Sequence, residues 1–394
     1  MINIAVCGKF HLLNYLPFLH DKSIINYIYM SHKHSTISSL GAISENIRNY
    51  PLKEYLTQLH GRVLGDKGYD ASLILYHKIW EYQVIKSWVP SEKLHVVAQG
   101  ASNGIIQNAI RSGTDKILVE VVNTHPLNRL EILQQECEMW KIRHVRKKLF
   151  VREELLLDEV SRATNLLAPT KFVAETYRKR GFQGEIHVIP YAANIEKFNS
   201  LIFQNEKKTK SEKIKIISVG QIGLRKGQLY LLKLLDFLGD KIELTLVGKI
   251  DSNVMSIVSK YEGRFIHYDR VASNKMPELL SHYDLFVSAS LEEGLAVSIC
   301  EAMAMGLAVI ATRESGAEEL INNMVNGILF DAGNFDQLKE KVEFLIEQED
   351  KILELGCNAR FDTQRVLNWK EYSDNLCKIY KLGLFKNLSA NNYV

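Results

Sequence analysis

Short apolar runs alternate along the chain with segments long enough to form helices. The runs lie at 3–7, 25–30, 95–100, 116–122, 165–169 and 187–190, and then at 214–220, 242–248, 264–268, 284–290, 307–312 and 327–330. They are rich in β-branched residues and mostly apolar, which is typical of parallel strands covered on both faces rather than of solvent-facing hairpins. The pattern therefore predicts an α/β protein built from doubly wound parallel sheets.

The polar stretch QNEKKTKSEK at 204–213 separates the two sets of runs. It contains no strongly apolar residue, so we expect a linker there. A chain of 394 residues is also longer than one ordinary core supports. We predict a first domain at 1–195 and a second at 196–371. Ligands of such sheets bind beyond the carboxyl ends of the strands, so the site is expected in a cleft between the domains.

Composition and charge narrow the class of protein. The 49 basic and 46 acidic residues give a net charge of +3, too balanced for a dedicated nucleic-acid binder. The five cysteines are scattered and include no CxxC, so they are expected to be reduced and mostly buried thiols. No apolar run approaches the roughly 18 residues of a membrane-spanning helix. The start, MINIAVCGKF, lacks the features of a signal peptide. A cytoplasmic protein is expected.

The stretch EEGLAVSICEAMAMGLAVIAT at 292–312 places one carboxylate, Glu301, in an otherwise apolar helix. A second, Glu293, lies eight positions earlier in the turn after a strand. An isolated buried charge is costly, so a partner for Glu301 is expected. The helix N-terminus behind this turn suits a phosphate or diphosphate, and two adjacent ribose hydroxyls suit Glu301. Alternatively, Glu293 is a solvated turn residue and Glu301 pairs with a basic neighbour.

The stretch IISVGQIGLRKGQLYLLKLL at 216–235 predicts another strand–turn–helix unit. It places Arg225 and Lys226 beside Gly227 at the start of a helix. Two cations there complement phosphate charge and would stabilise a departing diphosphate. By itself such a pair is more often solvated.

Several cofactor and metal motifs are missing from the sequence. There is no Asp-x-Asp and no His/Cys cluster with metal-ligand spacing, so no metal is expected. The GxGxxG and Walker A motifs are also missing, which disfavours a dinucleotide dehydrogenase or a P-loop ATPase. We expect no cofactor.

Three segments together resemble the donor-binding domain of glycosyltransferase family 4, whose members are retaining enzymes with the GT-B fold. They are ISVGQIGLRKG, DLFVSASLEEGLAVSICEAMAMGLAVIAT and SGAEELINNMVNGILF, and the likeness extends upstream through NLLAPTKFVAETYRKRGF and HVIPYAANIEKF. The most specific element is the E-x7-E pattern of Glu293 and Glu301. The resemblance implies two Rossmann-like domains facing a central cleft, with a final helix at about 372–394 packing back on the first domain.

The resemblance also implies roles for individual residues. Glu301 would hold the nucleotide ribose, Glu293 the transferred sugar and Lys226 the diphosphate. The backbone of the next three residues would meet the sugar and diphosphate, and two residues after the run 264–268 would contact the nucleotide base: these are Gly294, Leu295 and Ala296, and Arg270 and Val271.

The chain departs from the family pattern at several positions. Gln221 stands where the family often has an arginine, for which Arg225 can compensate. Leu295 and Ala296 replace a frequent Phe-Gly, which leaves the identity of the sugar open. Glu319 matches a recurrent family glutamate with a structural or secondary role.

In the first half, Gly8 follows the first strand where the family has a loop near the diphosphate. His11, in the same loop, either faces the cleft or caps a helix. His125 lies just past a strand and before a helix, where relatives have a histidine that bonds the transferred sugar and assists catalysis. The alternatives for His125 are a helix cap or a satisfied structural histidine.

The run WKIRHVRKKLFVR at 140–152 carries six Lys/Arg residues with Trp140 and Phe150. Family members often use lipid-linked acceptors at the membrane surface, and such a run suits anionic headgroups. A solvated helix face is the alternative.

The resemblance and the residues together predict a retaining, metal-independent glycosyltransferase. It would move a sugar from a UDP- or GDP-sugar to a hydroxyl of a glycan or lipid-linked acceptor. A role in cell-surface polysaccharide assembly, at the inner surface of the membrane, follows by analogy. A GT-B epimerase or phosphorylase, and an inactive glycan-binding or scaffold subunit, remain alternatives. The donor base, the acceptor and the oligomeric state stay open.

Overall fold

The structure is a computed structural model that describes residues 1–8, 10–19, 22–32, 46–65, 67–143, 146–192, 198, 213–366 and 368–381. Apart from Lys213, the linker predicted at 204–213 lies outside these residues. So does the end of the predicted C-terminal helix, 382–394.

Two parallel sheets form the framework, and the described strands of each pair only in parallel. The first sheet has the order β3-β2-β1-β4-β5-β6-β7. Its strands are β1 (Ile2–Val6), β2 (Ile25–Met30), β3 (Ile47–Asn49), β4 (Lys93–Val97), β5 (Lys116–Glu120), β6 (Asn165–Ala168) and β7 (Glu185–Val188). The second sheet has the order β10-β9-β8-β11-β12-β13. Its strands are β8 (Ile214–Val219), β9 (Ile242–Val247), β10 (Ile266–Tyr268), β11 (Leu285–Ser288), β12 (Ala308–Thr312) and β13 (Ile328–Phe330).

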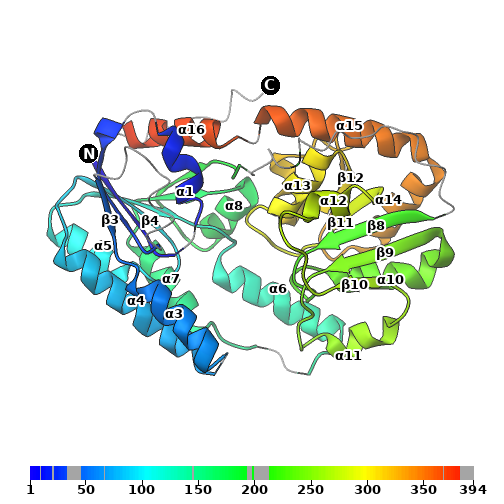
Figure 1. Ribbon diagram of the computed structural model, residues 1–394, viewed down its shortest axis with the longest axis horizontal. Helices are drawn as coiled ribbons and strands as arrows, with labels where there is room; N and C mark the ends of the chain where they lie inside the picture. Colours follow the sequence, from blue (N-terminus) through cyan, green and yellow to red (C-terminus); the bar gives the residue numbers. More distant parts are fainter. Residues whose placement is uncertain are drawn as a thin grey trace.

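Helices cover both faces of each sheet, and the two domains lie side by side (Figure 1). The first domain contains α1 (Leu12–Tyr15), α3 (Leu52–Val63), α4 (Tyr69–Lys86), α5 (Asn103–Arg111), α6 (Pro126–Met139), α7 (Val151–Ser161) and α8 (Lys171–Lys179). The later part of the chain contains α10 (Gln228–Leu238), α11 (Met255–Val258), α12 (Met276–Leu280), α13 (Val297–Met305), α14 (Phe335–Glu347), α15 (Glu349–Val366) and α16 (Trp369–Lys381). Two short 3-10 helices, η6 (Arg313–Ser315) and η7 (Ala317–Glu319), follow β12.

Each predicted strand is present. The inner strands bury both faces of their apolar runs in the middle layer of the sandwich, whereas β10, at the edge of the second sheet, is exposed. The strand that the sequence did not indicate is β3, Ile47–Asn49. It is short, partly polar and at the edge of the first sheet, where one flank is open and an apolar run is not needed.

The chain returns to the first domain at its end. Helix α15 packs on α13 in the second domain, and α16 lies over the first (Figure 1). Tyr372, Leu376 and Tyr380 of α16 are buried in the same apolar cluster as Ile4 and Val6 of β1. Polar bonds reinforce the contact, since Lys93 Nζ donates to the carbonyl of Tyr380 at 2.8 Å.

Two further expectations concern the state of the cysteines and the lack of a membrane-spanning helix. All five cysteines are free thiols, and only Cys357 is exposed, which confirms that they are reduced and mostly buried. Within the described residues, no helix combines the length and the apolar character needed to span a bilayer.

Candidate functional site

The loop that joins β11 to α13, residues 289–296, is anchored on both sides within the second domain. The N–H of Leu291 donates to the carbonyl of Arg225 at 2.8 Å. The N–H groups of Glu293 and Ala296 donate to carbonyls of η6, those of Glu314 at 2.9 Å and Ser315 at 3.2 Å. These bonds fix the loop at the carboxyl end of β11, where parallel sheets bind ligands.

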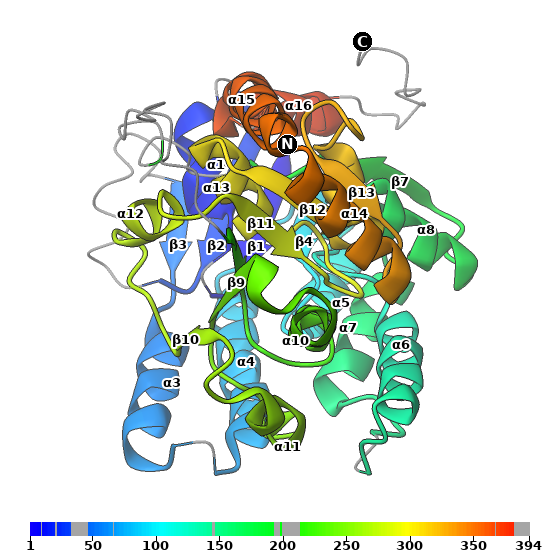
Figure 2. The same cartoon turned by 90° about the vertical axis from the view of Figure 1, so that its right-hand side faces the viewer.

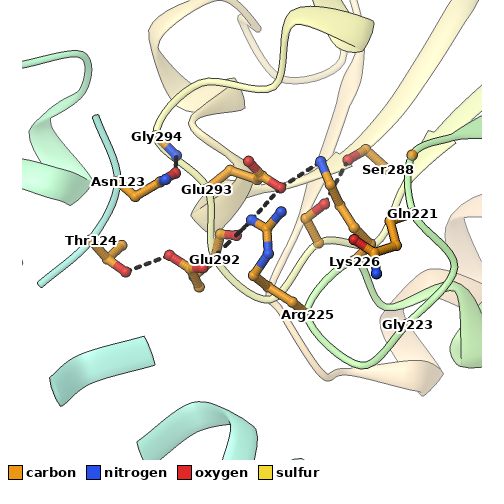
Figure 3. Close-up of polar contacts among 12 residues, drawn as sticks. Asn123, Thr124, Gln221, Gly223, Arg225, Lys226, Ser288, Glu292, Glu293 and Gly294 are labelled. Carbon is orange, nitrogen blue, oxygen red and sulfur yellow. Dashed lines mark hydrogen bonds and ion pairs between the residues drawn. The ribbon is translucent and has the colours of Figure 1, made fainter. Parts of the chain in front are cut away.

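The side chains of Arg225 and Lys226 reach Glu293, which lies in this loop (Figure 3). Arg225 Nη1 lies 2.6 Å and Lys226 Nζ 2.5 Å from the same oxygen, Glu293 Oε1. The two cations lie in the turn before α10, which begins at Gln228 after Gly227. Gly227 has φ +66°, and a Cβ there would lie 1.9 Å from the carbonyl oxygen of Ala289, so only glycine allows this approach of the two loops.

Glu292, next in the loop, is fully buried and joins the two domains. Its Oε2 accepts a hydrogen bond from the hydroxyl of Thr124, which follows β5 in the first domain. Its Oε1 lies 3.5 Å from Arg225 Nη1. Arg225 therefore contacts both carboxylates, and a first-domain residue helps to hold one of them.

A second contact between the domains lies beside the first. The N–H of Gly294 donates to Asn123 Oδ1 at 3.1 Å. A Cβ on Gly294 would lie 1.8 Å from the carbonyl oxygen of Val122, so the close approach of the two backbones requires glycine here. The Leu295 side chain then enters the apolar cluster of the first domain.

Helix α13 begins at Val297 without a side chain that caps it, because the N-cap residue is Ala296. The N-terminus of a helix attracts anions, and here it points at the edge where Arg225 and Lys226 lie. Glu301 is partly exposed on this helix, and the fully or nearly buried carboxylates are Glu292 and Glu293. The expectation that Glu301 is the buried charge is wrong, because the exposed side of α13 is the one that carries it.

His125 caps the N-terminus of α6. Its ring Nδ1 accepts the backbone N–H of Leu127 at 3.2 Å, and the backbone N–H of His125 donates to Thr176 Oγ1 at 3.0 Å. The ring lies edge-on to Tyr177. Burial, with the charge of Arg180, lowers the pKa of His125 from 6.5 to about 4, so the ring is neutral at pH 7.

Parts of this chain are similar in sequence to known glycosyltransferases. Residues 200–361 match the model of the family described as glycosyl transferases group 1. Over 206 residues the chain is 28% identical to N,N'-diacetylbacillosaminyl-diphospho-undecaprenol alpha-1,3-N-acetylgalactosaminyltransferase of Campylobacter jejuni, covering 50% of this chain and 53% of that protein. It is 27% identical to the amylovoran biosynthesis glycosyltransferase AmsK of Erwinia amylovora over 235 residues, 56% of this chain and 54% of AmsK. The chain thus matches about half the length of these relatives.

The solved structures extend the likeness to the whole chain. HepE of Anabaena in complex with UDP superposes with a TM-score of 0.65 at 16% identity, covering 96% of this chain and 98% of HepE. The chain has the GT-B fold of glycosyltransferases. The fold predicted from the sequence is confirmed.

Within the described part of the chain, three other residues predicted for a GT-B donor site make no hydrogen bond or ion pair with Glu293. The N–H of Gly8 donates to Ser31 Oγ at 2.8 Å, near Lys53 of the first domain. Arg270 is exposed, and Val271 packs against one face of the second-domain core. The contact of Arg270 and Val271 with the nucleotide base stays a prediction.

Two further predicted residues have structural contacts. Glu319 Oε1 accepts the N–H of Lys171 at 2.7 Å, so it ties η7 to the start of α8 across the GT-B domain boundary. His11 makes no side-chain cap bond to α1. Its ring packs against Tyr191 and Trp369, with ring centroids 4.2 and 5.2 Å away.

The basic run at 140–152 divides into bonded and exposed residues. Trp140 packs on Tyr230 of α10 and donates to Glu136, so it belongs to the contact between the domains. Arg146 pairs with Glu153 at 2.7 Å and lies over the Phe150 ring. The described residues that remain exposed are Lys141, Arg143, Lys147, Lys148 and Phe150 to Arg152.

Three residues of the site were not recognised in the sequence: Asn123, Thr124 and Glu292. Glu292 is one half of an adjacent acidic pair in the turn, and the other two immediately precede His125. All three lie shortly after the carboxyl end of a strand, β5 or β11, and this position in the sequence could have marked them as candidate site residues. Within the described residues, no group of three or more His, Cys, Asp or Glu side chains is placed to hold a metal ion.

Proposed function

We propose that the protein transfers a sugar from a nucleoside-diphosphate sugar to a hydroxyl group of an acceptor, with retention of anomeric configuration and without a metal. The observation that carries this proposal is the convergence of Arg225, Lys226 and Glu293 at the carboxyl end of β11, beside the N-terminus of α13. The family match covers this same region, and the related HepE binds UDP and UDP-glucose.

Each group has a role that follows from its chemistry. Arg225, Lys226 and the helix N-terminus would neutralise the charge that develops on the leaving diphosphate. Glu301, accessible on α13, would accept hydrogen bonds from the ribose hydroxyls. Glu293 and neutral His125 would position the sugar, and the backbone from Gly294 to Ala296 would meet the sugar and diphosphate. Retention rests on the family resemblance.

The acceptor is proposed to be a glycan or a lipid-linked sugar used in cell-surface polysaccharide assembly. The relatives support this, because one is named for a diphospho-undecaprenol substrate and another for amylovoran biosynthesis. Work on a lipid-linked acceptor would place the protein peripherally at the inner membrane surface, with the exposed cations of 140–152 toward anionic headgroups.

Calorimetric titration of UDP, GDP and ADP in the presence of EDTA tests the donor site. We expect one nucleotide to bind the wild type, and Glu301→Ala to lose about 1.5–3 kcal/mol of binding free energy, the range for a hydrogen bond to a charged group. The melting temperature of Glu301→Ala should equal that of the wild type, since Glu301 is partly exposed. Glu262→Ala, at an exposed residue of the same domain, is the matched control.

Two results would contradict the proposed function. A folded wild type that binds none of the three nucleotides contradicts the transferase proposal and favours the scaffold alternative. Binding that EDTA abolishes contradicts metal independence.

A further inference from the structure

Helix α3 presents an apolar stripe to solvent. Leu52, Tyr55, Leu59 and Val63 follow one another at intervals of three, four and four, so they share one face of the helix. They are 44%, 48%, 58% and 69% exposed, and Leu64 just beyond them is 52% exposed. Large side chains exposed singly are ordinary, but a continuous stripe of them indicates a contact surface.

The inner face of α3 shows that the stripe is not a misplaced core face. Lys53 and His60 are buried on that side, where His60 Nδ1 lies 3.2 Å from the Tyr76 hydroxyl of α4. Lys53 and His60 therefore face the protein, and the apolar stripe faces outward. This is the reverse of an ordinary surface helix.

Positive charge surrounds the stripe. Arg62, Lys67, Lys78 and Lys86 are exposed in the α3–α4 hairpin, whereas Asp70 is the exposed acidic residue among its described positions between 52 and 86. The outward side of α4 also carries Leu75 and Tyr82, 59% and 65% exposed. Lysine, tyrosine and leucine on one surface are typical of helices that lie in the headgroup region of a bilayer.

A second basic and apolar segment lies on the same side of the molecule. The turn after α3 and the segment that follows α6 both lie at the lower edge in two perpendicular views, and α15 and α16 lie at the upper edge (Figures 1 and 2). That segment contains exposed Lys147 and Lys148 beside Phe150 and Val151, which are 57% and 58% exposed. A flat membrane surface on this side of the molecule can therefore contact both the α3–α4 hairpin and this segment.

We propose that the α3–α4 hairpin docks the protein on an anionic lipid bilayer, with the α3 stripe entering the headgroup region and the lysines contacting lipid phosphates. Charge complementarity selects this occupant, because a second copy of the same face would bring like charges together. The 146–152 segment adds cations to the same contact. The inference deepens the proposed function by giving the enzyme a route to a lipid-linked acceptor, but it can be tested without any turnover.

Vesicle flotation tests the proposal with the full chain. The wild type should float with phosphatidylcholine vesicles that contain phosphatidylglycerol, and much less with phosphatidylcholine alone. Leu59→Gln should lower the partition coefficient about tenfold, because one leucine no longer enters the apolar region. Leu353→Gln on α15 is the matched control, since Leu353 is 57% exposed on the opposite side of the molecule and should have no effect.

Charge is tested separately with Lys67→Gln/Lys78→Gln. This variant should bind about fivefold more weakly for each charge removed, and the deficit should shrink as salt is added. Calorimetric UDP binding by Leu59→Gln should match the wild type, which separates docking from the donor site.

Two results would overturn the proposal. One is equal flotation of Leu59→Gln and Leu353→Gln. The other is a wild-type dimer in solution that Leu59→Gln dissociates while vesicle binding is absent, which would make the stripe a contact between copies. Failure of the wild type to bind any of UDP, GDP and ADP would reject the donor site and leave the flotation result standing.

Discussion

Glu293 sets the charge balance of the proposed donor site. Its Oε1 lies within 2.6 Å of both Arg225 and Lys226, so both cations are already paired with a carboxylate of the protein itself. A diphosphate that uses these cations must compete with Glu293 and displace it. Displacement would release the carboxylate toward the sugar that the donor carries.

This competition predicts the effect of Glu293→Gln on nucleotide binding. UDP should bind about tenfold more tightly, because removing a charge-assisted hydrogen bond leaves two cations in need of an anion. Calorimetry at fixed salt measures the change. Glu262→Gln removes the same charge from an exposed position and should not tighten binding. Weaker UDP binding by Glu293→Gln would show that the carboxylate does not occupy the diphosphate position.

Helix α6 links the two domains at the scale of elements. It begins at Pro126, directly after the N-cap residue His125, and it ends against α10, where Tyr230 donates to Glu136 Oε1 at 2.9 Å. Burial raises the pKa of Glu136, and the Tyr230 and Trp140 donors oppose that rise. The start of α6 therefore lies beside the site, and its C-terminal end contacts α10 of the second domain.

The cap role of His125 predicts a stability change with a known sign. His125→Ala should lower the free energy of unfolding by about 1 kcal/mol at pH 7, and His125→Asn should lose less because asparagine also caps helices. Since burial lowers the pKa of His125 from 6.5 to about 4, its contribution is present above pH 6.5 and is lost as pH falls through about 4. Urea unfolding across this range measures it.

A catalytic role for His125 is separable from the cap. If the ring positions the sugar, His125→Asn should fold nearly as well as the wild type yet show a reduced kcat with a nucleotide-sugar donor. Full activity in His125→Asn would leave the residue as a cap alone.

The two domains meet directly in the whole molecule. Thr124 bonds Glu292, Asn123 bonds Gly294, and Leu295 enters the first-domain core. Near the C-terminus, helix α16 also packs on the first domain, against β1 and β4. Under the proposed function, the domains must separate for a donor to enter between these loops and close for the sugar to be transferred.

Gly294→Ala should hold the domains apart. The added Cβ would lie 1.8 Å from the Val122 carbonyl oxygen and 3.3 Å from Pro169, both in the first domain. We expect a larger radius of gyration in small-angle scattering and a loss of turnover, with the second domain still folded. Gly61→Ala on α3, where a Cβ meets nothing within 4 Å, is the matched control. Scattering identical to the wild type would argue against this contact in solution.

The sequence by itself determined the strands, the parallel sheets and the turns that carry Arg225, Lys226 and Glu293. These features follow from local periodicity, because an apolar run with a turn behind it has few ways to be buried in an α/β fold. The position of a turn at the carboxyl end of a strand also fixes which edge its side chains share.

Tertiary structure alone decided which charges are buried and which partners they have. Glu292 and Thr124 are 168 residues apart and Gly294 and Asn123 are 171 apart, so no local pattern pairs them. Likewise, the apolar stripe of α3 has the spacing of any core-facing helix, and only the packing of its opposite face on α4 turns it toward solvent. Periodicity specifies a face, and the neighbours that cover it depend on how distant segments dock.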